Sequence, residues 1–198
     1  VQQHLQGADA VILPGGFAHG DYLRTGAMAR FSPIMPAVRA FAERGGPVLG
    51  ICNGFQILCE AGLLPGVLRR NESLSFVCRD VPLVVERTDT PFTARCHDGQ
   101  ELVIPVKHGE GQFVARPDDL ARIEAEALVT FRYCGPGGEL DDEHNVNGST
   151  GSIAGIRNPQ GNVAGLMPHP EHAVDPDVGP TGGQPLLASL LAFALARV

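Results

Sequence analysis

Residues 47–56 of the chain read Pro47-Val48-Leu49-Gly50-Ile51-Cys52-Asn53-Gly54-Phe55-Gln56, and they carry its strongest structural signal. The first five residues form an apolar run that is typical of a strand buried on both faces. Over residues 53–61 the apolar side chains fall on one side at helical spacing, and Gly62 ends this pattern. The stretch therefore predicts a buried strand that turns directly into a helix.

The segment before this stretch shows the same alternation. A short apolar run at residues 8–13 stops at Pro14-Gly15-Gly16, as a buried strand does when it ends in a tight loop. A helical pattern follows over residues 27–41, and Pro33 and Pro36 are expected to split it. Strand, helix, strand and helix in this order predict a parallel sheet with helices on both faces.

The second half of the chain is richer in strand signals. Apolar runs at residues 76–78, 83–85 and 102–106 predict a hairpin layer attached to the sheet. Later strands are expected at residues 128–133, 153–156 and 163–167, and a closing helix at residues 184–197. We therefore predict a single α/β domain over residues 1–198, built as a three-layer, mostly parallel sheet flanked by helices.

Composition and charge argue against several classes of protein. The longest nearly unbroken apolar stretch, residues 186–196, is much shorter than the ~20 residues of a membrane-spanning helix, so we expect no membrane partner. The formal charge is −7 and the basic residues are scattered, which argues against nucleic acid as a partner. There is no signal-peptide pattern and the number of cysteines is odd, so a cytoplasmic protein without a disulfide framework is expected. The spacing of Cys and His predicts no metal site.

Cys52 lies in a Gly-x-Cys-x-Gly frame at the predicted turn from strand to helix. The frame follows the logic of the nucleophile elbow, in which flanking glycines remove side chains that would clash in a strained turn. The helix N-terminus favours the thiolate over the thiol, and the backbone N–H of Asn53 points to where an oxyanion would form. The alternative is a small buried cysteine beside an ordinary turn, and from these residues alone both interpretations stay open.

A nucleophilic cysteine requires a base, and His169 is the best candidate among the histidines. It follows a predicted buried strand, at the carboxyl edge of the sheet where such folds place their chemistry. Pro168 and Pro170 hold it extended, so the side chain of Glu171 can face the same way and orient the imidazole.

Two further strand ends carry suitable groups. Gly15 and Gly16 could offer a second backbone N–H to an oxyanion. His108-Gly109-Glu110-Gly111 follows another strand with polar groups that suit the amino-acid end of a small substrate. Each segment alone reads as a turn, but four such strand ends together indicate one shared cleft.

These motifs resemble a known family. Gly50-x-Cys52-x-Gly54-x-Gln56 and His169-Pro170-Glu171 match the class I, or triad-type, glutamine amidotransferases. Within them the chain resembles the glutaminase subunits of phosphoribosylformylglycinamidine synthase, and the segments that carry this narrower match are residues 13–17, 20–27, 70–76, 108–111, 147–149 and 153–156. The resemblance implies a flavodoxin-like fold, and the chain is expected to begin without the first βα unit of that fold.

The resemblance also implies the chemistry. Cys52 would attack the side-chain amide of glutamine, His169 would protonate the departing ammonia, and Glu171 would complete the triad. The oxyanion donors would be Gly16 and Asn53, and the residues that bind glutamine would be Gly50, Gln56, His108, Glu110 and Gly111. The ammonia would pass to a larger synthase subunit that uses ATP and Mg²⁺ to convert formylglycinamide ribonucleotide to its amidine. This chain would itself hold no cofactor or metal, and a small third subunit would be a further partner.

Two alternatives come from other classes. A stand-alone cysteine peptidase or deglycase of related fold would share the cysteine turn, but such proteins usually lack the His-Pro-Glu segment at this position. A regulatory amidotransferase-like module with a silenced site would not be expected to keep Cys52, His169 and Glu171 together.

Overall fold

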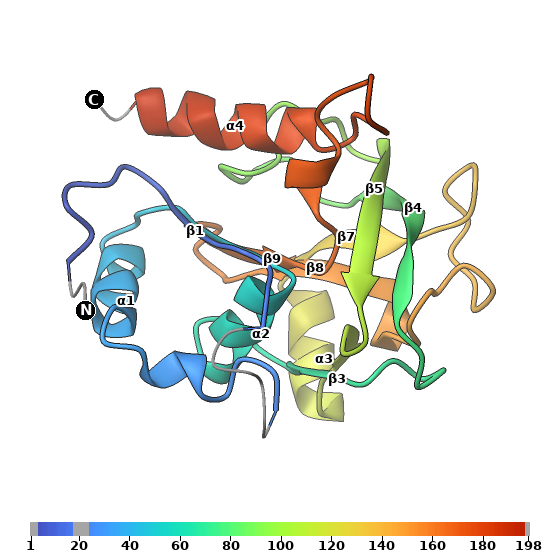
Figure 1. Cartoon of the computed structure of the whole chain (residues 1–198), viewed down its shortest axis with the longest axis horizontal. Coiled ribbons are helices and arrows are strands. Elements are labelled where there is room, and N and C mark those ends of the chain that lie inside the picture. Colours follow the sequence, from blue (N-terminus) through green and yellow to red (C-terminus); the bar gives the residue numbers. More distant parts are fainter. Residues whose placement is uncertain (1–3, 18–23, 197–198) are drawn as a thin grey trace.

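A computed structural model describes residues 4–17 and 24–196 of the chain. Within these ranges seven strands form one sheet, in the spatial order β1-β2-β9-β8-β7-β4-β5 (Figure 1). Their bounds are β1 Val11–Leu13, β2 Val48–Ile51, β4 Val77–Val85, β5 Glu101–His108, β7 Val129–Tyr133, β8 Ile153–Arg157 and β9 Val163–Leu166. A second, two-stranded antiparallel sheet pairs β3 (Val67–Arg69) with β6 (Gln112–Val114).

Strand direction in the large sheet is mostly uniform. The strands β1, β2 and β9 pair in parallel, whereas the pairings from β9 through β8, β7 and β4 to β5 are antiparallel. Five of the seven described strands, β1, β2, β9, β7 and β5, therefore run in the same direction, and β8 and β4 run against them. The predicted hairpin layer is part of this sheet, because β4 pairs with both β5 and β7.

The helices cover both faces of the sheet, as a three-layer architecture requires. In Figure 1, α1 (Met35–Glu43), α2 (Asn53–Glu60) and α3 (Pro117–Ala125) lie on one side and α4 (Gln184–Leu195) on the other. Three short 3₁₀ turns complete the described elements: Ala29–Phe31, Thr150–Ser152 and η4 (Pro170–His172). The first of these is separate from α1, as the prolines in this segment predict.

Some elements differ from the expectations. Residues 77–78 of the first run and the run at 83–85 belong to one strand, β4, because residues 79–82 between them pair with β5; Phe76 lies just before the strand. The short strands β3 and β6 were not predicted, and neither was α3. Ile123 is the only buried residue of α3, so this helix lacks an apolar stripe. Its signal is instead Pro117 at the first position, with Asp118 and Asp119 in the first turn.

Close contacts at two glycines hold α2 against the centre of the sheet. A Cβ atom at Gly165 of β9 would lie 2.2 Å from Cδ2 of Phe55, so the ring of this fully buried side chain rests directly on the strand. A Cβ atom at Gly54 would lie 1.9 Å from the carbonyl oxygen of Leu13, at the end of β1. Only glycine permits either contact, so the first turn of α2 is fixed against β1 and β9.

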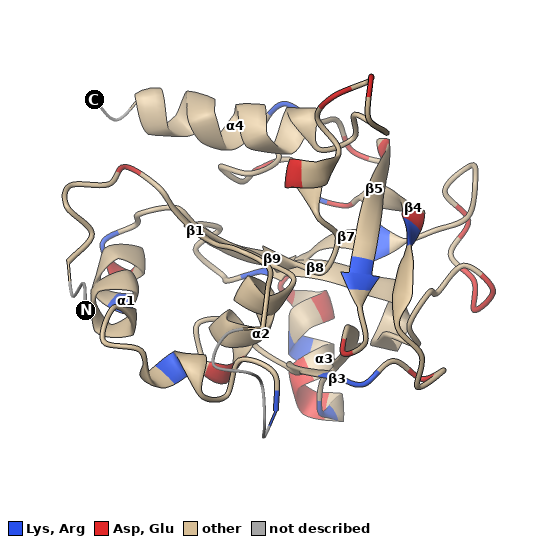
Figure 2. Cartoon of the chain, viewed as in Figure 1, with Lys and Arg blue, Asp and Glu red and all other residues tan. Residues whose placement is uncertain are grey.

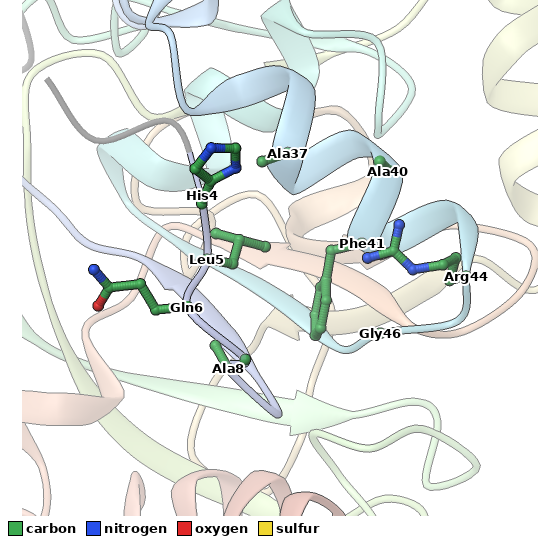
Figure 3. A pocket seen from close by; sticks show the side chains of 10 residues that line it. His4, Leu5, Gln6, Ala8, Ala37, Ala40, Phe41, Arg44 and Gly46 are labelled. Atoms are coloured by element: carbon green, nitrogen blue, oxygen red, sulfur yellow. The ribbon is translucent and has the colours of Figure 1, made fainter.

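Other surface features carry no predicted site residue. A hollow of about 470 Å³ lies between the N-terminal segment and α1, beside Leu5, Phe41 and Arg44 (Figure 3). Figure 2 shows Lys and Arg scattered over the described elements rather than gathered in a stripe. No helix of the described ranges is long and apolar enough to cross a membrane. The five cysteines all lie in the described part of the chain and are free thiols.

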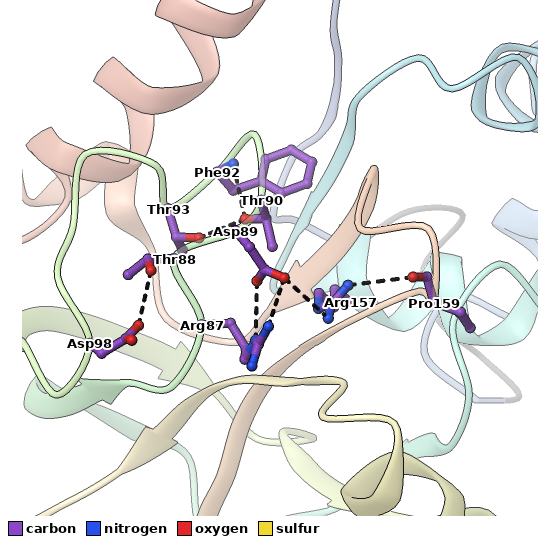
Figure 4. A network of polar contacts seen from close by, with 9 residues as sticks. All are labelled: Arg87, Thr88, Asp89, Thr90, Phe92, Thr93, Asp98, Arg157 and Pro159. Atoms are coloured by element: carbon purple, nitrogen blue, oxygen red, sulfur yellow. Dashed lines mark hydrogen bonds and ion pairs between the residues drawn. The ribbon is translucent and has the colours of Figure 1, made fainter.

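A polar network fastens the loop between β4 and β5 to the end of β8 (Figure 4). Arg87 donates two hydrogen bonds to the carboxylate of Asp89, at 3.1 and 2.7 Å, and Nη2 of the buried Arg157 lies 3.7 Å from the same group. The hydrogen bond from Arg87 lowers the pKa of Asp89 below its ordinary value of 3.8, and the charge of Arg157 adds to the lowering against the opposing effect of burial. The network thus stabilises the ionised carboxylate in the folded state.

Asp89→Asn should lower the free energy of unfolding at pH 7 by about 0.5–1 kcal/mol, a small value because the carboxylate is half exposed. A carboxyl group whose pKa is lowered by folding contributes stability above its unfolded pKa and loses it as the pH falls. The difference between variant and wild type in urea titrations should therefore shrink as the pH falls below 3.8. Asp142→Asn in the exposed acidic loop is the control, and an equal effect there would contradict the assignment.

Candidate active site

Four segments with polar or glycine residues come together where strands of the same direction end. They are Gly15-Gly16 after β1, Cys52 after β2, His108 at the end of β5 and His169 shortly after β9. The carboxyl edge of such a sheet is the usual place for a binding crevice. The four segments therefore lie together at one edge of the sheet, as the predicted cleft requires.

The backbone at Cys52 forms a strained turn. Its φ and ψ angles of 49° and −106° are rare for a residue with a side chain, and its N–H donates to the carbonyl oxygen of Leu166 at 2.8 Å. A Cβ atom at Gly50 would lie 2.7 Å from the carbonyl group of Gly54. Together with the contact between Gly54 and Leu13, this explains both glycines of the frame and confirms the predicted elbow.

The thiol of Cys52 lies at the start of α2, among backbone groups. Helix α2 begins at Asn53, so the positive end of the helix dipole is directed at the sulfur. The side chain is buried, and Sγ lies 3.9 Å from the carbonyl oxygen of Lys107 on β5. The nucleophile predicted from the sequence thus lies between β2, α2 and β5.

His169 and Glu171 are hydrogen-bonded to each other. Nδ1 of His169 lies 2.6 Å from Oε1 of Glu171, and the backbone N–H of His169 donates to Pro105 O at 2.8 Å. Nε2 of His169 is buried and has no hydrogen-bond partner among the described residues. The carboxylate thus orients the ring through Nδ1 and leaves Nε2 for the reacting group, as in a nucleophile triad.

Gly15 lies beside both the nucleophile and the imidazole. A Cβ atom at this position would lie 2.7 Å from Cε1 of His169 and 3.5 Å from Cβ of Cys52. Both side chains therefore border the same glycine, and they also line the same pocket. The absence of a side chain at Gly15 allows the ring of His169 to approach the cysteine turn, a role that the sequence analysis did not identify.

The carboxylate of Glu171 is kept ionised by its neighbours. Partial burial opposes ionisation, but the hydrogen bond with His169, a hydrogen bond from the backbone N–H of Glu171 and the electrostatic attraction of His169 and His172 outweigh it, so the pKa of Glu171 is lowered. An ionised carboxylate at this position stabilises a protonated His169.

The turn at residues 108–111 is held by Asn71, which the sequence analysis did not include among the site residues. The Asn71 amide donates to the carbonyl oxygens of Ser75 and His108, at 2.8 and 2.9 Å. Its Oδ1 accepts from the backbone N–H of Gly111 at 3.0 Å and lies 3.1 Å from Nδ1 of His108. Because Oδ1 can only accept, Nδ1 of His108 carries the proton, and its buried Nε2 is a bare acceptor.

His108 is neutral at ordinary pH. Burial lowers the pKa of its imidazole from 6.5 to about 4, and the charge of His169 adds to this effect. A second imidazole close to the triad therefore remains uncharged when His169 accepts a proton.

Gln56 connects α2 to the same turn. Its Oε1 accepts from Nδ2 of Asn53 at 2.8 Å, and its Nε2 donates to the carbonyl oxygen of Glu110 at 2.6 Å. The side chain thus fixes the distance between the cysteine turn and residues 108–111, and it also borders the pocket.

A pocket of about 590 Å³ opens over these residues. Among the predicted site residues, those that line it are Gly16, Cys52, Gln56, His108, Glu110 and His169. The others lie behind its wall: Gly50 and Asn53 within the elbow, Gly111 against the ring of His108, and Glu171 behind His169. Residues 20–23 of the sequence match lie outside the described residues.

The pocket also has lining residues that sequence reasoning missed. Thr25, Arg70 and Lys107 border it, and Oγ1 of Thr25 is buried without a hydrogen-bond partner among the described residues. Thr25 and Arg70 lie in the segments 20–27 and 70–76 that carry the family resemblance, and Lys107 is the single lysine of the chain and stands next to the His108 turn, but none of the three was assigned to the site. Thr25 and Arg70 reach the pocket through folding of distant segments.

One group of described side chains could sterically surround a metal ion. Ligand atoms of His169, Glu171 and His172 lie within 4.8 Å of one another. However, Nδ1 of His169 and Oε1 of Glu171 are already joined by their hydrogen bond. Because these two atoms already bind each other, the arrangement favours a catalytic triad over a metal site.

The arrangement suits acyl transfer. A thiol at a helix N-terminus, an imidazole with one free nitrogen and an ionised carboxylate form a nucleophile, a base and an orienting group. The pocket is of a size for a small molecule, and its polar wall offers both donors and acceptors.

Comparisons with known proteins agree with this chemistry. A family model described as "CobB/CobQ-like glutamine amidotransferase domain" matches residues 1–182. A curated protein of Nitrobacter winogradskyi, named phosphoribosylformylglycinamidine synthase subunit PurQ, is 57% identical over 187 residues, which cover 94% of this chain and 80% of that protein. The PurQ protein of Salinibacter ruber is 60% identical over 183 residues, which cover 92% and 78% of the two chains.

A solved structure has the same fold. The structure titled "Structure of PurLQS from Thermotoga maritima" matches with a TM-score of 0.84 and 42% sequence identity. The match covers 98% of this chain and 83% of that chain.

His108 should stay neutral in the folded protein until the pH falls to about 4. Because folding lowers this pKa below 6.5, the unfolded state binds more protons between these values, and stability should fall as the pH falls from 6.5 toward 4. A pH titration of the imidazole signals by NMR tests this, with the His108 signal assigned by its loss in His108→Gln. A midpoint near 6.5 would contradict the proposed burial and tautomer.

Proposed function

The chain belongs to the CobB/CobQ-like glutamine amidotransferases, and within them to the PurQ subunits of phosphoribosylformylglycinamidine synthase; on this basis we propose how its residues act. It is an enzyme, the glutaminase subunit of a ligase complex in purine biosynthesis. Membership excludes a stand-alone peptidase or deglycase. The observation that carries the residue assignment is that Cys52 and the ring of His169, which Glu171 orients, both lie against Gly15.

In the first half of the reaction, Cys52 attacks the side-chain carbonyl carbon of glutamine. His169 takes the thiol proton through Nε2 and gives it to the departing nitrogen, so that ammonia leaves and a glutamyl thioester remains. Water then attacks the thioester, His169 accepts a proton from the water and returns it to the sulfur, and glutamate is released. Glu171 holds the ring and stabilises its cation at each transfer.

The oxyanion of each tetrahedral intermediate requires donors near Cys52. We assign this role to the backbone N–H groups of Asn53 and Gly16. Asn53 follows the nucleophile at the start of α2, and Gly16 lines the pocket with a φ of 147°, which a residue with a side chain rarely adopts.

The remaining site residues bind or frame the glutamine. The carboxylate of Glu110 supplies a negative charge at the wall of the pocket and suits the α-ammonium group, and the neutral His108 frames the same wall. Gln56 and Gly111 hold the turn that carries these groups, and Gly50 allows the elbow to form.

The ammonia is used by a partner, the synthase subunit that makes phosphoribosylformylglycinamidine. Three large apolar side chains at the pocket, Phe17, Leu74 and Phe76, are 76%, 77% and 60% exposed. Such exposure around a reactive site suits contact with another protein, and we assign this rim to the synthase. A small third subunit is a further partner of the complex.

The chain needs no cofactor for its own step, because the hydrolysis of an amide by a thiol and an imidazole consumes only water. We assign ATP and Mg²⁺ to the synthase subunit. The free state of all five cysteines supports a reducing compartment, the cytoplasm.

Cys52→Ala should abolish glutamine hydrolysis in the complex with the synthase, with a loss of about 10⁴-fold or more, because the nucleophile is gone. Synthesis of the amidine from added ammonium should continue at the wild-type rate. Glutamate release and amidine formation are measured separately. Continued glutamate release by the variant would contradict the assigned nucleophile, and Cys59→Ala is the matched control.

Gly15→Ala should lower kcat/KM for glutamine about 100-fold, because the added methyl group displaces His169 from Cys52. Gly179→Ala is the control, since a Cβ atom there meets nothing within 4 Å. Thermal unfolding of both variants distinguishes a displaced ring from a misfolded chain. A Gly15→Ala protein with wild-type glutaminase activity would show that His169 does not act at this position.

A further inference from the structure

The single lysine of the chain lies at the active site but has no part in the reaction steps above. Lys107 is the residue before His108 on β5, and its carbonyl oxygen lies 3.9 Å from the sulfur of Cys52. Its side chain borders a hollow behind the triad, where its Nζ contacts Nδ1 of His172. The backbone of Lys107 therefore lies near the nucleophile, and its side chain contacts His172 behind the triad.

This contact fixes the tautomer of His172. An ammonium group can only donate, so Nδ1 of His172 accepts the hydrogen bond from Lys107. The proton of a neutral imidazole then resides on Nε2. That nitrogen lies 3.7 Å from Oε1 of Glu171, which is too long for a hydrogen bond but close enough for electrostatic attraction.

The carboxylate of Glu171 consequently lies between two imidazoles. Oε1 is hydrogen-bonded to Nδ1 of His169 at 2.6 Å and lies 3.7 Å from Nε2 of His172. The centroids of the two rings are 5.3 Å apart, and the rings are inclined by 47°. The carboxylate is held by its hydrogen bonds with His169 and with the backbone N–H of Glu171, and the attraction of His172 restricts its rotation further.

We propose that His172, held by Lys107, is a positioning residue that keeps Glu171 aligned on His169 during glutamine hydrolysis. This proposal rests on the proposed function of Cys52, His169 and Glu171. Neither Lys107 nor His172 exchanges a proton with the substrate in it. They act only through Glu171, and so their effect belongs to kcat rather than to the binding of glutamine.

The effect should be moderate. The side chain of His172 is 46% exposed and that of Glu171 is 36% exposed, so solvent weakens the interaction between them. Loss of this attraction should reduce kcat by about tenfold, which is much less than loss of the nucleophile. It should also raise the pKa of Glu171, because the electrostatic interaction with His172 contributes to lowering it.

Two substitutions at position 172 separate the proposed role from a merely structural one. His172→Phe keeps a ring but removes both nitrogen atoms. His172→Gln keeps one acceptor, which can receive the hydrogen bond from Lys107, and one donor, which can face Glu171. His144→Phe is the control, because His144 hydrogen-bonds to Asp141 in an exposed loop that is distant in the sequence from position 172.

The variants are assembled with the synthase subunit, and glutamate release is measured against glutamine concentration and pH. We expect His172→Phe to lower kcat about tenfold with KM within twofold of wild type, and His172→Gln to stay within threefold in both. The acid limb of the kcat profile should move to higher pH in His172→Phe only. The hollow behind Glu171 is also lined by Arg79, Asp80 and Asp175. These residues are the same in every variant, so a shift of the acid limb is caused by the substitution at position 172.

A double-mutant cycle tests the part of Lys107. Lys107→Met should lower kcat in the wild-type background but cause no further loss in His172→Phe, because the lysine acts through the imidazole. Additive losses would contradict this path. Wild-type kcat in His172→Phe, or equal losses in His172→Phe and His172→Gln, would overturn the proposal while leaving the result for Cys52→Ala, and thus the proposed function, unaffected.

Discussion

The contact between Gly54 and the carbonyl group of Leu13 is the constraint from which the site follows. A Cβ atom at Gly54 would lie 1.9 Å from that oxygen, so the first turn of α2 rests directly on the end of β1. The chain reaches this contact only through the strained backbone of Cys52, which aims the sulfur out of the turn at the edge of the sheet. The same end of β1 continues into Gly15, whose bare Cα leaves room for His169. One close approach thus locates the nucleophile, the gap for the imidazole and the first turn of the helix.

The site also depends on the curvature of the sheet. In the order of strands, β9 and β5 are separated by β8, β7 and β4, so a flat sheet would hold them about 19 Å apart at ~4.8 Å per strand. Yet the N–H of His169, just beyond β9, donates to Pro105 on β5 at 2.8 Å. Figure 1 shows β4 and β5 running steeply across the direction of β1 and β9. The antiparallel half of the sheet therefore bends back over the parallel half and brings Lys107 and His108 to the cysteine turn.

Sequence reasoning worked where local rules govern the structure, and it failed where distant segments meet. Glycine spacing around Cys52 and the prolines beside His169 are local signals, and they were enough to predict the elbow and the proximity of Glu171 to the ring. Helix α3 also had local signals at its N-terminus, but its single buried side chain gave no periodic pattern. Asn71 and Thr25 lie in segments that carry the family resemblance, but no local signal gave them a role in the site, because that role depends on residues that lie about 30 or more positions away in the chain.

The charged group that hydrogen-bonds to His169 is the carboxylate of Glu171. When the ring accepts the thiol proton, its positive charge faces the ionised Glu171 through Nδ1. The imidazole of His108 is also near, but burial and the charge of His169 lower its pKa to about 4, so it does not add a competing positive charge. Nε2 of His169, which is buried without a partner among the described residues, is then the position from which the proton leaves. Since the two imidazoles differ in the charge of their hydrogen-bond acceptors, a carboxylate for His169 and a neutral amide for His108, the surroundings rather than the ring itself decide which histidine acts as the base.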